Sequence, residues 1–254
     1  MSKKDYTHIT IILDRSGSMS SCLADTIGGF NRFLLTQKEQ PGEASMTMIQ
    51  FDNQYEVLMD MLPLTNAIDL NNENYAPRGS TALLDAIGRT INNVEHQINE
   101  KEEDQKPEKT IFVIITDGEE NASLEFTRDQ VMGMINRHRD EDKWEFVFIG
   151  ANQDAIQAGG GIGIRAASSL SYDQSHIGTQ TMYQSLTRNM VDYRSADVNE
   201  VSNDSYAFFS GKDREEQDEI NSKDNAKDDF LKNPKGFLKG MYVDTKTVDT
   251  KTSD

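Results

Sequence analysis

Apolar runs and amphipathic runs alternate along the first three quarters of the chain. The apolar runs predict strands at 7–14, 44–52, 55–62, 110–117 and 144–152, and the amphipathic runs predict helices at 23–37, 80–98, 127–139 and 176–194. Strands that alternate with helices are typical of an open, mostly parallel sheet with helices on both faces. Only a few residues separate the second and third strands, so these two are expected to form a hairpin.

Aspartates at the ends of predicted strands are the first candidates for a functional site, and two of them are considered together. The run THITIILD (7–14) ends at Asp14, and the run TIFVIITD (110–117) ends at Asp117. The carboxyl ends of parallel strands meet at one edge of the sheet, where open α/β sheets bind their ligands. We therefore expect the two carboxylates to lie on the same rim.

Hydroxyl side chains accompany these carboxylates. Asp14, Ser16 and Ser18 form the pattern D-x-S-x-S, and Thr81 stands at the start of a predicted helix. Oxygen ligands of this kind suit Mg²⁺, and they also suit Mn²⁺ and Ca²⁺. A serine helix cap is the simpler alternative, but one capping serine would suffice and would leave the spacing with Thr81 and Asp117 unexplained. The pattern predicts a cation site that retains positive charge and accepts an anionic ligand from outside.

Two arginines lie beside these motifs. Arg15 follows Asp14, and Arg78 precedes the GST segment that contains Thr81. Guanidinium groups at these places would favour an acidic partner. A local salt bridge explains them equally well, and the sequence leaves the two alternatives open.

The segments DRSGS, GST before a helix, and an apolar strand ending in TDG resemble, in this order, the metal-ion-dependent adhesion site of von Willebrand factor type A domains. The resemblance covers roughly residues 5–195. It implies a Rossmann-like, doubly wound sheet with one antiparallel edge strand at 55–62. It further implies that Ser16, Ser18 and Thr81 bind the cation directly, that Asp14 and Asp117 bind it directly or through water, and that a partner protein's Asp or Glu completes the coordination. The chain is also similar to stand-alone intracellular bacterial and phage members, including the tellurium-resistance-associated type.

Charge and composition narrow the partners. The 254 residues include 26 Lys and Arg against 43 Asp and Glu, a net charge of −17, which disfavours binding to a phosphate backbone. Neither a membrane-length apolar run nor a signal-peptide core is present, so we expect a cytoplasmic protein that binds neither nucleic acid nor membrane. The single cysteine, Cys22, has no partner for an internal disulfide and is expected to be a buried helix residue.

The last quarter of the chain has a different composition. Residues 196–254 are highly charged and almost free of aliphatic side chains, so the sequence predicts a domain at 1–195 followed by an acidic, largely disordered tail. Two apolar segments interrupt the tail, YAFF (206–209) and FLKNPKGFLKGMYV (230–243). They either dock on a partner or pack back on the domain.

Enzyme motifs are missing from the chain. It contains no G-x-S-x-G elbow and no phosphate-binding GxxxxGK[ST] loop, and Ser16 stands where a haloacid-dehalogenase-type phosphatase would need a second carboxylate. The expected function is a non-catalytic module that binds Mg²⁺ and an acidic residue of a partner protein. The alternatives are a metal-dependent phosphoester hydrolase and a scaffold whose tail is the main interaction element.

Overall fold

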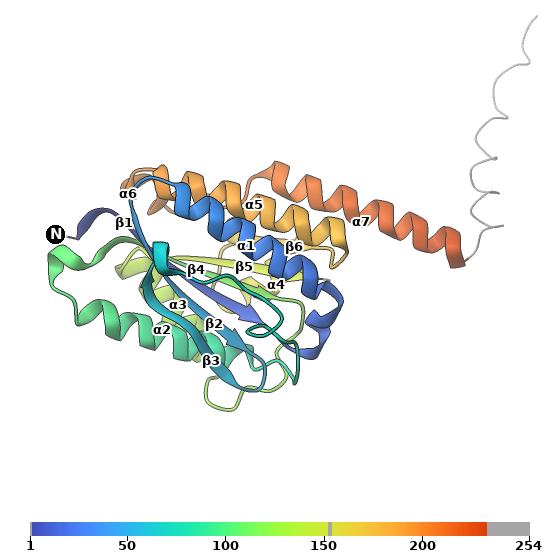
Figure 1. Cartoon of the computed structure of the whole chain (residues 1–254), viewed down its shortest axis with the longest axis horizontal. Coiled ribbons are helices and arrows are strands. Elements are labelled where there is room, and N and C mark those ends of the chain that lie inside the picture. The colour runs from blue at the N-terminus through green and yellow to red at the C-terminus, as the bar shows by residue number, and fades with distance from the viewer. Residues whose placement is uncertain (1, 152–153, 233–254) are drawn as a thin grey trace, which may run out of the picture.

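The fold is built on one six-stranded sheet with strand order β3-β2-β1-β4-β5-β6, in which only β3 is antiparallel (Figure 1). The structure is a computed structural model that describes residues 2–151 and 154–232, with side chains described up to residue 222. The strands are β1 (Lys3–Asp14), β2 (Glu43–Phe51), β3 (Tyr55–Pro63), β4 (Pro107–Thr116), β5 (Glu145–Ala151) and β6 (Ser169–Tyr172). The predicted doubly wound sheet with an antiparallel edge strand is confirmed.

Helices cover both faces of the sheet. They are α1 (Leu23–Glu39), α2 (Leu83–Asn99), α3 (Arg128–Glu141), α4 (Ala155–Gly160), α5 (His176–Ser195), α6 (Val198–Val201) and α7 (Gly211–Lys232). The apolar residues of α1 and α5 join one core cluster, and those of α2, α3 and α4 join a second cluster on the opposite face. In Figure 1, α1, α5 and α7 accordingly lie on one side of the sheet and α2 and α3 on the other.

The central strands divide their side chains between these two clusters. In β1, Ile11 and Leu13 enter the α1–α5 cluster, whereas Ile12 enters the α2–α3 cluster. This period of two is the geometry of a strand buried on both faces. The packing of α1 on α5 depends on Gly29, because a Cβ there would lie 2.2 Å from the ring of Tyr183. With the core in place, the strand ends are held at a defined edge.

In the segment after residue 195, the structure differs from the predicted disorder as far as residue 232. Residues 196–232 include α6 and α7, and α7 runs along α5. Phe208 and Phe209 are buried in the α1–α5 cluster, which shows that the YAFF segment packs back on the domain. The other apolar segment, 230–243, lies outside the residues whose side chains are described.

Two further expectations concern the burial of Cys22 and the absence of a membrane-spanning segment. Cys22 is buried, as predicted, at the end of the 3₁₀ turn Gly17–Cys22 that leads from β1 into α1. Within the described part of the chain, no helix is both long and apolar enough to cross a membrane.

Candidate functional site

The predicted cation ligands meet at the carboxyl edge of the sheet. Strands β1 and β4 are parallel neighbours, so Asp14 at the end of β1 lies beside the turn that follows β4 and carries Asp117. The hydroxyls of Ser16 and Ser18 share a hydrogen bond of 3.1 Å, and the Ser18 hydroxyl donates to Asp117 Oδ1 over 2.7 Å. A continuous row of oxygen atoms therefore connects the two turns.

Asp14 is the most deeply buried member of the row. It is fully buried, its Oδ1 accepts the Ser16 N–H over 2.6 Å, and its Oδ2 accepts the Thr116 hydroxyl over 2.6 Å. Burial raises the pKa of this carboxyl to about 6, although both hydrogen bonds act in the opposite direction. Thr116 was not predicted as a site residue, and a polar residue just before the terminal aspartate of an apolar strand was the available clue.

Thr81 reaches the same edge from the other side. It lies in the loop before α2 rather than in the helix, and its backbone N–H donates to Asn121 Oδ1 over 3.0 Å. A Cβ at Gly118 would lie 2.8 Å from the Thr81 hydroxyl oxygen, so a glycine after Asp117 permits this close approach. All five predicted side chains are therefore gathered at one rim.

The donor set fits a hard divalent cation. Neighbouring ligand oxygens around octahedral Mg²⁺ lie about 3.0 Å apart, and the observed separations of 2.7 and 3.1 Å agree with that spacing. Among the described residues, no cationic side chain pairs with Asp14, so a bound cation would balance a buried charge. In the same residues, no group of three or more His, Cys, Asp and Glu side chains is placed to hold a metal.

Gln174 is a second residue of the site, after Thr116, that the sequence did not predict. Its amide donates to Asp117 Oδ2 and, over 3.3 Å, to the carbonyl of Ser18. Gln174 lies in the loop between β6 and α5, far from both residues in sequence. Only the tertiary fold brings it to the rim, and no sequence pattern marked it.

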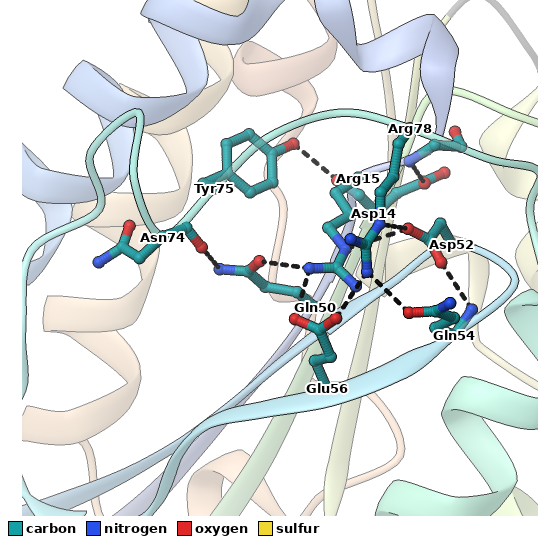
Figure 2. Close-up of polar contacts among 10 residues, drawn as sticks. Asp14, Arg15, Gln50, Asp52, Gln54, Glu56, Asn74, Tyr75 and Arg78 are labelled. Atoms are coloured by element: carbon teal, nitrogen blue, oxygen red, sulfur yellow. Dashed lines mark hydrogen bonds and ion pairs between the residues drawn. The ribbon is translucent and has the colours of Figure 1, made fainter.

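The two arginines take part in a local cluster of ion pairs, shown in Figure 2. Arg15 is only 4% exposed, and it pairs with Asp52 over 3.2 Å and Glu56 over 2.6 Å. Arg78, whose side chain is 50% exposed, pairs with the same two carboxylates over 2.9 and 2.6 Å. The structure thus shows the local salt bridge that the sequence allowed for both arginines. A contact between Arg15 or Arg78 and a partner stays a prediction.

Comparisons with known proteins agree with this fold. The family model of the von Willebrand factor type A domain matches residues 8–185. A search of curated protein sequences finds no significant match. Among solved structures, the pilus adhesin SpaC from Lactobacillus rhamnosus GG has a TM-score of 0.55 at 15% identity, and the match covers 74% of this chain and 30% of that chain.

Two other structures are similar at the same level. The vWF domain of a type V pili tip protein from Porphyromonas gingivalis has a TM-score of 0.53 at 8% identity over 75% of this chain and 97% of that one. Proximal thread matrix protein 1 from the mussel byssus, with a zinc occupied MIDAS motif, has a TM-score of 0.52 at 11% identity over 73% of this chain and 46% of that one. The match therefore spans about half of the mussel protein. At these identities the likeness concerns the fold.

Proposed function

The chain belongs to the von Willebrand factor type A family, and on this premise we propose that it is a metal-dependent protein-binding module. The observation that carries the proposal is the row of oxygen donors at the carboxyl edge, where Asp14, Ser16, Ser18, Thr81 and Asp117 come together. An acidic side chain of a partner protein would complete the site. Mg²⁺ is the proposed cation, with Mn²⁺ and Ca²⁺ as alternatives that the oxygen donors also suit.

The chain's own residues explain why such a site would accept an acid. Three of the donors, Ser16, Ser18 and Thr81, contribute neutral hydroxyls. The carboxylate of Asp14 also accepts hydrogen bonds from the Ser16 N–H and the Thr116 hydroxyl. When bound, the cation supplies the positive charge that attracts a carboxylate in a protein with a net charge of −17. The proposed partner is therefore a protein that presents Asp or Glu.

We propose binding rather than catalysis. Two described side chains that contact the donor row, Thr116 and Gln174, are held in hydrogen bonds to Asp14 and Asp117. Both support the carboxylates instead of facing a substrate. Cytoplasmic location, exclusion of nucleic acid and membrane, and the likeness to tellurium-resistance-associated proteins stay predictions.

The first test is a calorimetric titration of Mg²⁺, Mn²⁺, Ca²⁺ and Zn²⁺ into the full chain. Asp14→Ala and Ser16→Ala should weaken cation binding by at least about a hundredfold, because each removes a direct or supporting donor. Ser20→Ala is the matched control, since Ser20 is an exposed serine of the same turn outside the D-x-S-x-S pattern. A folded wild-type chain that binds none of these cations, or an Asp14→Ala variant that binds like wild type, would contradict the proposal.

A second test addresses the partner. Immobilised wild-type chain should capture a protein in Mg²⁺ and release it in chelator, whereas Asp14→Ala should capture none and Ser20→Ala should behave as wild type. Replacing the partner's contacting Asp or Glu by its amide should then abolish capture. Capture that survives both chelator and Asp14→Ala would place the interaction elsewhere on the chain.

A further inference from the structure

A cluster of four charged side chains lies at the rim and joins two of its turns. The charge cluster consists of Arg15, Asp52, Glu56 and Arg78 (Figure 2). We propose that Asp52 and Arg78 are positioning residues that hold the Thr81 turn at the distance from Asp14 that cation binding requires. This inference rests on the proposed function, because it assigns a task within the same site.

Asp52 is the centre of the charge cluster. It follows β2 directly, is fully buried, and its Oδ2 lies 3.2 Å from Arg15 Nε and 2.9 Å from Arg78 Nε. Its backbone carbonyl accepts the N–H of Ala82, the neighbour of Thr81, over 3.0 Å. One residue therefore contacts the turn after β1 through Arg15 and the Thr81 turn through Arg78 and Ala82.

Backbone hydrogen bonds join the same two turns directly. The N–H of Arg78 donates to the carbonyl of Arg15 over 2.7 Å, and the N–H of Gly17 donates to the carbonyl of Gly79 over 3.3 Å. Gly79 has φ +69°, and a Cβ there would lie 2.3 Å from Asn53 Oδ1. A side chain at this position would therefore disturb the hydrogen bond between Gly17 and Gly79. These amides report on the relative position of the turns without any bound metal.

Both arginines of the charge cluster also contact residues of the β2–β3 hairpin. Arg78 Nη2 lies 2.6 Å from Glu56 Oε1 and donates to Gln54 Oε1 over 2.8 Å, while Arg15 Nη1 binds the other carboxylate oxygen of Glu56. The hydrogen bond from Arg15 is the main reason that the pKa of Glu56 is lowered to about 2. Both arginines are thus fastened to the hairpin of β2 and β3.

The Thr81 turn, residues 75–82, is held by individual hydrogen bonds rather than by a regular element. Residues 75–82 contain neither helix nor strand, so the ladder of a regular element does not fix their position. A metal ligand must be held within about 0.5 Å of its working position, and the groups that orient ligands change metal affinity about 10–100-fold when they are lost. The arginine and carboxylate pairs supply that orientation from the edge hairpin.

The decisive measurement is hydrogen–deuterium exchange of the full chain without metal, comparing wild type with Arg78→Met. Amides at 78–82 and at 17 should exchange about tenfold faster in the variant, with β4 unchanged. Arg137→Met is the matched control, because Arg137 is 43% exposed and pairs through two nitrogens with Glu95 at a distance from the rim. Unchanged exchange at 78–82 in a folded Arg78→Met chain overturns the inference, whether or not the chain binds a cation.

A double-mutant cycle with Thr81→Ala links the cluster to the site. Arg78→Met should weaken Mg²⁺ binding about tenfold, Arg78→Lys should restore part of it, and Thr81→Ala should cost less in the Arg78→Met background than in wild type. Additive effects would contradict positioning through Thr81. A wild-type chain that binds no cation would refute the proposed function, and the exchange measurement would still decide whether the cluster holds the two turns together.

Discussion

The carboxyl rim of the sheet and the C-terminal segment 196–222 are held in opposite ways. At the rim, short turns are fixed by hydrogen bonds and ion pairs among polar side chains, and a carboxylate such as Asp14 is buried without a cationic partner among the described residues. In the C-terminal segment, Phe208 and Phe209 enter the core, and buried Asp213 pairs with Arg188 of α5 over 2.5 Å.

Stability and ligand binding make different demands on these two regions. Apolar burial in the C-terminal segment stabilises the fold directly. The rim places polar groups where a ligand can meet them, at the cost of burying a charge. Variants of the two regions should therefore change the free energy of unfolding in different directions.

Phe208→Ala should lower the free energy of unfolding by about 3–5 kcal/mol, because it empties a buried aromatic site. Urea unfolding followed by circular dichroism measures the change. Leu124→Ala is the control, since that leucine is 94% exposed and should alter stability by less than about 0.5 kcal/mol. Equal stability of both variants would mean that the YAFF segment contributes nothing to the domain.

Lys109→Met should lower the free energy of unfolding by about 2–3 kcal/mol. The buried Lys109 ammonium on β4 donates to the carbonyls of Tyr193, Arg194 and Ala196, where α5 ends and the C-terminal segment begins. Loss of the ammonium leaves these carbonyls without a donor, so amides near residue 196 should also exchange faster. Lys3→Met, at an exposed ion pair, is the control. Equal effects of the two substitutions would show that Lys109 does not connect β4 to the C-terminal segment.

Asp14→Asn should leave the metal-free protein as stable as wild type or raise its free energy of unfolding by about 1 kcal/mol at pH 7.5. Because the folded-state pKa is about 6 against an ordinary 3.8, Asp14 stabilises the fold below about pH 4, and this contribution is lost as pH rises through 6. The variant should therefore have a flatter stability profile between pH 4 and 7.

The same pair of proteins tests the cation. Saturating Mg²⁺ should raise the melting temperature of wild type and leave that of Asp14→Asn unchanged, since a ligand stabilises only the chain that binds it. If Asp14→Asn instead destabilises the metal-free protein by several kcal/mol, the rim would be a structural element like the C-terminal segment, and the contrast between the two regions would disappear.

The sequence was informative wherever a property depended on neighbours along the chain. Apolar and amphipathic runs predicted the strands and the helices that alternate with them. The spacing D-x-S-x-S predicted which side-chain oxygens lie together in the turn after β1. Strand ends in a parallel sheet share one edge, so Asp14 and Asp117 could be placed on the same rim without a structure. The helix predicted at 127–139 begins with a signal of the same local kind, the capping box between Thr127 and Gln130.

Tertiary structure alone decided what depends on residues distant in sequence. Gln174 reaches Asp117, and Asp52 joins Arg15 to Arg78, through contacts that no local pattern encodes. The ordered course of residues 196–222 likewise depends on two phenylalanines finding a core built by earlier elements, which an average over a charged segment conceals. Local spacing determines which chemical groups are present at a turn, whereas their orientation and support come from packing across the whole sheet.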